Sequence, residues 1–203
     1  MLCIYVHNSY IKMETENKII KLFIKEKKAE TIREISKKIK ADYRITHTAV
    51  QRLLDKNILL SDSVGKSTLC RLNNDYYGIE IYGAENQKKE ILLKNKSIKQ
   101  LYKEVISKMK TGFFIFLVFG SFAKGELTKT SDVDVMFISN EKGFEEKISD
   151  IISLLPIKIH ALVFTEEEFI RMKDSKNLNV IKEVIENNVI LYGIENYYRL
   201  KNA

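Results

Sequence analysis

In the first third of the chain, apolar residues follow a helical period in three successive segments, with charged residues between them. Two shorter apolar runs come next, separated by Gly65-Lys66, a pair suited to the two-residue turn of a β-hairpin. The pattern therefore predicts helices followed by a hairpin, over residues 14–27, 31–39, 45–56, 58–64 and 67–72.

The start of the second helix has a signal of its own. Thr31 and Glu34 have the spacing of a capping box, in which each side chain satisfies the other residue's backbone amide. After the hairpin, residues 84–110 are predicted to be helical, with an interruption near Asn95. This lysine-rich connector either extends a basic surface or serves as a dimerising helix of a homodimer, and the sequence does not choose between them.

The second half has the pattern of a sheet with flanking helices. Residues 113–119 are a continuous apolar run, typical of a strand that is buried on both faces. The run ends at Gly120-Ser121, and after a polar loop a second strand opens with Ser131-Asp132-Val133-Asp134. Later segments complete the pattern: a strand over 157–164, two or three helices over 166–201, and a short apolar stretch at 189–192.

Composition and charge narrow the class of protein. With 45% hydrophobic and 30% charged residues, the chain is expected to fold and to bury a core. Residues 1–110 carry a surplus of ten positive charges and residues 111–203 a surplus of three negative ones. A basic half indicates a polyanionic partner, although a lysine-rich surface throughout would give the same sum. Two widely spaced cysteines and no membrane-length apolar run favour a cytoplasmic protein with no membrane partner.

Helices followed by a hairpin resemble the winged helix-turn-helix family, over residues 13–75. In such domains the third helix enters the major groove and the wing contacts the DNA backbone. The resemblance implies double-stranded DNA as a partner, and protein–protein interaction is the alternative for this family. The candidate DNA contacts are Arg44, Thr46, His47, Thr48, Gln51 and Arg52 on the outward face of the third helix, and Lys66 at the wing tip.

Asp132 and Asp134 are candidate metal ligands. Alternate residues of a strand point the same way, so both carboxylates project from one face of the predicted strand. Two neighbouring carboxylates repel each other unless a cation neutralises them. Mg²⁺ prefers a few carboxylates together with nucleotide phosphate oxygens, so this pair indicates a site for Mg²⁺ or Mn²⁺ and an NTP.

The motif resembles the polymerase-β-like nucleotidyltransferase superfamily, in which a Gly-Ser pair precedes Asp-x-Asp by roughly ten residues. Here ten residues separate Ser121 from Asp132. Minimal nucleotidyltransferases of bacteria and archaea often carry Gly-Ser-x-Ala-Arg-Gly followed by Ser-Asp-x-Asp. This chain has Gly-Ser-Phe-Ala-Lys-Gly and Ser-Asp-Val-Asp, with Lys124 at the place of the usual arginine.

The resemblance implies an α+β fold, with a mixed sheet and flanking helices, for residues 111–203. It also implies that Gly120 and Ser121 bind the triphosphate, and that Asp132 and Asp134 are catalytic residues that hold Mg²⁺. Lys124 either contacts phosphate or caps its loop. The acceptor would be a hydroxyl, with a protein acceptor as one candidate, because some minimal nucleotidyltransferases act as antitoxins that modify a partner.

One feature departs from that family. Active members usually carry a third carboxylate on a later strand, but the strand at 157–164 contains no acid. His160 on this strand is either a base or ligand, or a structural residue. Glu166, Glu167 and Glu168 follow, and Thr165 with Glu168 has capping-box spacing, so the start of a helix is the preferred interpretation of these acids.

The sequence thus predicts a two-domain protein in which a DNA-binding winged helix-turn-helix precedes a Mg²⁺-dependent nucleotidyltransferase. The alternative is a DNA-binding transcriptional regulator or antitoxin-like protein whose degenerate transferase domain only binds nucleotide. A third hypothesis makes the second half a partner-binding module without a ligand. The predicted boundaries are an extension at 1–12, the winged domain at 13–75, a connector at 76–110 and the transferase domain at 111–203.

Overall fold

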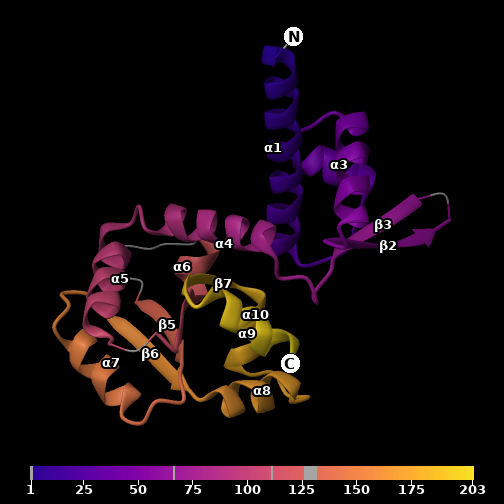
Figure 1. Ribbon diagram of the computed structural model, residues 1–203. Coiled ribbons are helices and arrows are strands. Elements are labelled where there is room, and N and C mark those ends of the chain that lie inside the picture. Colours follow the sequence, from indigo (N-terminus) through magenta and orange to yellow (C-terminus); the bar gives the residue numbers. More distant parts are fainter. Residues whose placement is uncertain (1, 66, 111, 126–131) are drawn as a thin grey trace. The chain divides into compact units, whose positions relative to one another are not determined.

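The computed structural model describes the backbone of residues 2–65, 67–110, 112–125 and 132–203, with side chains from Glu14 onward (Figure 1). The chain divides into two compact units, Met1–Ala84 and Glu85–Ala203. No helix within the described ranges is both long enough and apolar enough to span a membrane.

The first unit contains the predicted helices and the predicted hairpin. Its sheet has the order β1-β3-β2, and both pairings are antiparallel. The short first strand pairs with the hairpin and was not predicted, because two residues are too few to show an apolar period. The elements are α1 (Leu2–Glu26), β1 (Glu30–Thr31), α2 (Ile32–Lys38), α3 (Tyr43–Asp55), β2 (Leu59–Val64) and β3 (Ser67–Leu72).

Local signals explain where these elements begin. The Thr31–Glu34 capping box forms as predicted. Helix α3 starts two residues before its predicted start, because the Asp42 carboxylate accepts from the amides of Arg44 and Ile45. Helix α1 starts at Leu2, so the residues predicted as a loose extension are helical over 2–12, and no glycine or proline interrupts the helix.

The second unit contains a mixed sheet with helices on both faces. Helix α4 spans Ile79–Leu92, so the division between the units falls within it, whereas the sequence placed a separate connector at 76–110. Asn95 interrupts the helical stretch as predicted, by capping the next helix. The further elements are α5 (Lys96–Lys108), β4 (Ile115–Phe119), α6 (Gly120–Lys124), β5 (Val133–Ile138), α7 (Phe144–Ser153), β6 (Ile159–Phe164), α8 (Glu166–Asp174), α9 (Val180–Glu186), β7 (Asn188–Tyr192) and α10 (Ile194–Asn202).

Strand order within this sheet is β6-β5-β4-β7. Strand β4 is antiparallel to both of its neighbours, and β5 is parallel to β6. Every residue of β4 is buried, as its continuous apolar run predicted. Because the buried strand β4 ends at Phe119, the chain leaves the core at Gly120.

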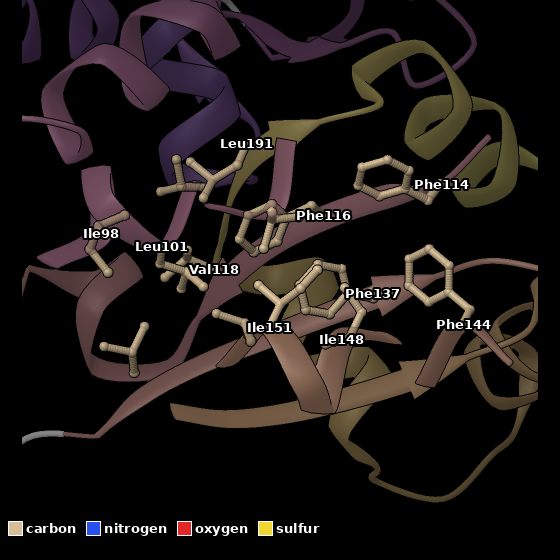
Figure 2. Packing of buried hydrophobic residues seen from close by; sticks show 14 residues of the cluster. Ile98, Leu101, Phe114, Phe116, Val118, Phe137, Phe144, Ile148, Ile151 and Leu191 are labelled. Carbon is tan, nitrogen blue, oxygen red and sulfur yellow. The ribbon is translucent and has the colours of Figure 1, made fainter. Parts of the chain in front are cut away.

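The core on one sheet face lies beneath α5 and α7 (Figure 2). Ile98 and Leu101 of α5, together with Ile148 of α7, pack on aromatic residues of the strands. The rings of Phe116 and Phe137 stack there with centroids 4.5 Å apart. Val133 and Val135 of β5 belong to this core, so the alternate residues of β5 face the opposite side of the sheet.

Candidate functional site

Gly120 stands where β4 ends and the short helix α6 begins. Its φ is +64°, a left-handed conformation that favours glycine. A Cβ built on this residue would lie 2.5 Å from Oδ2 of Asp134 on the neighbouring strand β5. The structure therefore brings the Gly-Ser element and one aspartate of the Asp-x-Asp element into direct proximity, and a Cβ at position 120 would require the Asp134 carboxylate to shift.

The two aspartates lie at the start of β5. Asp134 is the second residue of the strand, and its side chain is 30% exposed. Asp132 immediately precedes the strand and is exposed. Because Val133 and Val135 point into the core under α5 and α7, Asp134 belongs to the other face, where strand alternation also places Asp132. Both predicted carboxylates are thus accessible from solvent at one end of one strand.

His160 faces Asp134 from the adjacent strand. The two residues are register partners in the parallel pair of β5 and β6, and Nδ1 of His160 lies 3.3 Å from Oδ1 of Asp134. The histidine side chain is 62% exposed, which argues against a role in filling the core. The sequence left the role of His160 open because pairing between strands that are distant in sequence leaves no local signal.

Helix α6 contains the two further nucleotide-binding candidates, Ser121 and Lys124. Ser121 lies in its first turn and is half-buried, and α6 contacts both β4 and β5. Among the described residues no side chain caps the start of α6, so its first amides do not have the partner that a capping side chain would supply. Nζ of Lys124 lies 3.4 Å from Glu183 of α9 in a partly exposed pair, which holds a lysine only weakly.

The acids after β6 do not reach the aspartates. Glu168 forms the capping box with Thr165, as predicted, and this contact lowers its pKa through the backbone hydrogen bond from Thr165. Glu166 lies two residues after the last residue of β6, whereas Asp134 lies near the first residue of β5. The parallel strands therefore separate these acids from the aspartates by the length of the sheet.

A hollow of about 550 Å³ lies at that other end of the strands, lined by Lys110, Phe113, Asn140, Glu141 and Glu166. The amide of Glu166 donates to Oδ1 of Asn140 at its wall. The hollow is broad and open, and none of the nucleotide-binding candidates lines it. We therefore centre the candidate site on Asp134 rather than on the hollow.

The donor set of the aspartate cluster fits a divalent cation. Two solvent-accessible carboxylates on one face supply the hard oxygen ligands that Mg²⁺ and Mn²⁺ take, and leave room for phosphate oxygens. A Cβ at position 120 would crowd Oδ2 of Asp134, and glycine avoids that contact. Within the described part of the chain, no three His, Cys, Asp or Glu side chains are grouped closely enough to hold an ion unaided. Ligands from a nucleotide would have to complete the coordination.

In the first unit, one stripe of α3 is exposed. Arg44, His47, Thr48 and Gln51 recur at helical spacing along it, and all four are solvent-accessible as the sequence predicted. The ring of His47 packs near that of Tyr43, with centroids 6.1 Å apart. Hydroxyl, amide and guanidinium groups on a single exposed stripe are the groups that read base edges in the major groove.

Two residues predicted for this surface are placed elsewhere. Thr46 is fully buried, and its hydroxyl donates to the backbone oxygen of Asp42 within its own helix, so burial leaves it satisfied. Arg52 turns toward α1, where its Nη1 lies 2.9 Å from Oε1 of Glu16. Thr46 is thus wrongly predicted as an outward residue, and Arg52 has an internal partner. Lys66 lies outside the described residues.

Comparison with known proteins agrees with the site in the second unit. No curated protein matches the chain. Residues 96–196 match the family model described as "Polymerase beta, Nucleotidyltransferase". The match runs from the start of α5 into α10 and includes Gly120, Asp134 and His160. Over these residues the second unit is therefore similar to the nucleotidyltransferase domains of the polymerase β family.

Proposed function

We propose that the second unit transfers a nucleoside monophosphate from an NTP to a hydroxyl acceptor. The observation that carries the proposal is the proximity of Gly120 to Asp134, because it joins the two halves of the sequence motif at one point. In the reaction, the acceptor oxygen forms a bond to the α-phosphorus and the bond to the departing pyrophosphate breaks. The proton of the acceptor hydroxyl passes to water.

The residues of this chain have separate roles in that reaction. The amides at the start of α6, with the Ser121 hydroxyl, bind the outer phosphates. Lys124 is free to exchange its weak contact with Glu183 for a phosphate oxygen. Asp132 and Asp134 hold a divalent cation, which when bound stabilises the negative charge that develops on the phosphates.

We further propose that the first unit is a winged helix-turn-helix domain that binds double-stranded DNA. The order of its helices and hairpin supports the assignment, as does the exposed stripe of α3. The surplus of positive charge in residues 1–110 favours a polyanionic partner. Arg44, His47, Thr48 and Gln51 are the proposed base and phosphate contacts, with Lys66 as a phosphate contact of the wing.

A second candidate function is a DNA-binding regulator, or antitoxin-like protein, whose transferase domain binds nucleotide without turnover. The observation that favours it is the identity of the residue beside Asp134, which is an imidazole rather than a carboxylate. A third, a partner-binding module, requires no nucleotide at all. These alternatives differ in measurable binding and transfer, so one set of variants separates them.

The test of transfer uses the full chain with ATP labelled at the α-phosphate. Label should become attached to the protein itself or to protein in an added cell extract, and Asp134→Asn should remove this transfer. Asp150→Asn, on an exposed position of α7 under the other sheet face, is the matched charge control. Aspartate-dependent ATP binding without any transfer would overturn the enzyme proposal in favour of the regulator. Failure to bind ATP would leave the third candidate.

The test of DNA binding uses a duplex of random sequence and fluorescence anisotropy over a range of salt concentrations. Affinity should fall steeply with salt if several phosphates are contacted. Arg44→Ala should weaken binding and reduce the slope of log K against log salt by about one if its contact is to phosphate. Arg171→Ala, exposed on α8 of the other unit, is the matched control. Salt-insensitive binding, or equal losses in both variants, would overturn the DNA proposal.

A further inference from the structure

His160 and Asp134 present two potential ligand atoms to the same point in space. They are register partners on adjacent parallel strands, and Nδ1 of one lies 3.3 Å from Oδ1 of the other. Two atoms that ligate one ion through bonds of about 2.1 Å are about 3.0 to 3.4 Å apart when they occupy adjacent coordination positions. The observed separation lies within that interval.

The two side chains reach this separation through the backbone. Each is the second residue of its strand, and the ladder of β5 and β6 fixes their spacing from Val133 and Ile159 onward. Ile159 and Ala161 pack against the core on the α5 and α7 side, so His160 is directed to the face of the aspartates. Its side chain is 62% exposed, so an incoming ion and nucleotide can reach it.

The chemistry of the donor set then affects which ion is preferred. Oxygen ligands suit Mg²⁺, whereas imidazole nitrogen raises affinity for divalent transition metals along the series from Mn²⁺ toward Zn²⁺. A site that adds an imidazole nitrogen to the Asp134 carboxylate discriminates between ions that an all-oxygen site would treat more equally. Among the histidines whose side chains the structure describes, His160 is the one that lies beside the aspartate cluster.

We propose that His160 ligates the divalent cation of this site together with Asp134, and that it gives the site a preference for a transition metal such as Mn²⁺ over Mg²⁺. This inference rests on the proposed nucleotide–metal site. The same contact has a simpler interpretation, in which Nδ1–H of His160 donates a hydrogen bond to Asp134 and the histidine does not bind the ion. The proposal differs from it in making His160 a metal ligand.

The experiment titrates the full chain with Mn²⁺, in the presence of a non-hydrolysable ATP analogue, and detects bound Mn²⁺ by electron paramagnetic resonance. Competition with Mg²⁺ gives the ratio of the two affinities. His160→Asp replaces nitrogen by oxygen and should lower the preference for Mn²⁺ over Mg²⁺ by about tenfold or more. The electron spin echo of bound Mn²⁺ should show modulation by ¹⁴N, which His160→Asp should remove.

A matched control keeps His160 as the chain's one imidazole. The sequence contains three histidines, so His7→Ala combined with His47→Ala leaves only His160, and the ¹⁴N modulation should persist. Circular dichroism of each variant reports whether it is folded. Should His160→Asp not fold, His160→Asn provides a second variant without an imidazole ligand, and it should lose the same modulation.

The possible failures are distinguishable. Mn²⁺ that binds in an Asp134-dependent way but shows no ¹⁴N modulation, and no change of metal preference in His160→Asp, would overturn the role of His160 alone. Mn²⁺ binding that does not depend on Asp132 or Asp134 would overturn the proposed nucleotide–metal site itself. Modulation that disappears when His7 and His47 are replaced would assign the nitrogen ligand to a different residue.

Discussion

The Cβ position of Gly120 and Oδ2 of Asp134 are separated by only 2.5 Å. Gly120→Ala would therefore force the Asp134 carboxylate to move, and it would also place alanine at a φ of +64°. We expect loss of ATP binding together with destabilisation of more than about 1 kcal/mol, the typical cost of left-handed backbone for a residue with a Cβ. Isothermal titration with ATP and urea unfolding measure the two effects.

Gly143→Ala is the control for backbone strain alone. Gly143 has a φ of +72°, and a Cβ there would have ordinary contact, with Oε2 of Glu146 nearest at 3.6 Å. This variant should lose about 1 kcal/mol of stability and keep its ATP affinity. If Gly120→Ala bound ATP as tightly as Gly143→Ala does, the fit between Gly120 and Asp134 would have no bearing on the nucleotide.

Elements that depend on local signals could be predicted from the sequence. The buried strand β4, the hairpin and the capping boxes at Thr31 and Thr165 each have a signal confined to a few neighbouring residues. The Gly-Ser and Asp-x-Asp elements were likewise visible, because their spacing is short. What the sequence could not supply was the register of β5 against β6, which brings His160 to Asp134.

Thr46 shows a second limit of pattern analysis. A polar residue near the start of a helix is normally assigned to the outer face, yet the Thr46 hydroxyl finds its acceptor one turn earlier in the same helix, at Asp42. The Thr46 hydroxyl is thereby hydrogen-bonded without water and can be buried. Because the burial of Thr46 depends on which way the helix turns toward its neighbours, composition alone could not reveal it.

Thr46 and Thr48 provide a matched pair for the DNA surface. Both hydroxyls donate to a carbonyl one turn earlier, at 2.8 and 2.9 Å, but Thr46 is buried and Thr48 is exposed. Thr48→Val should weaken DNA binding by about fivefold, the loss of one hydrogen bond of about 1 kcal/mol, with little change in stability. Thr46→Val should leave DNA affinity unchanged. Anisotropy titrations that ranked the two variants in the opposite order would contradict the assigned face.

Arg52 is expected to contribute to stability rather than to DNA recognition. Its guanidinium contacts Glu16, whose side chain is only 13% exposed. Arg52→Ala should lower the free energy of unfolding of the first unit by about 1 kcal/mol, because it leaves a largely buried carboxylate with a weaker partner, Lys56 at 3.4 Å. Urea unfolding measures this change.

The comparison variant for Arg52 is Arg71→Ala. Arg71 lies 3.7 Å from Asp62 in a pair whose two side chains are 49% and 66% exposed, so its loss should cost little. A double-mutant cycle of Arg52→Ala with Glu16→Ala should give a positive coupling energy. A tenfold loss of DNA affinity in folded Arg52→Ala would instead indicate that Arg52 contacts DNA.

Cys70 should respond to pH through its burial. The thiol is fully buried in β3, and burial raises its pKa to about 11 from an ordinary value of 9.0. The folded state therefore holds the thiol proton more tightly than the unfolded state does. The stability that this difference contributes is fully present below about pH 9 and is lost as pH rises toward about 11. Thermal melts of the wild type and of Cys70→Ala over this interval should converge as the pH increases.

In a Cys3→Ser background, where Cys70 is the one remaining cysteine, labelling by a thiol reagent at pH 8 should require opening of the hairpin or unfolding, and its rate should rise with urea. Rapid labelling of the native protein without urea would contradict the burial of Cys70.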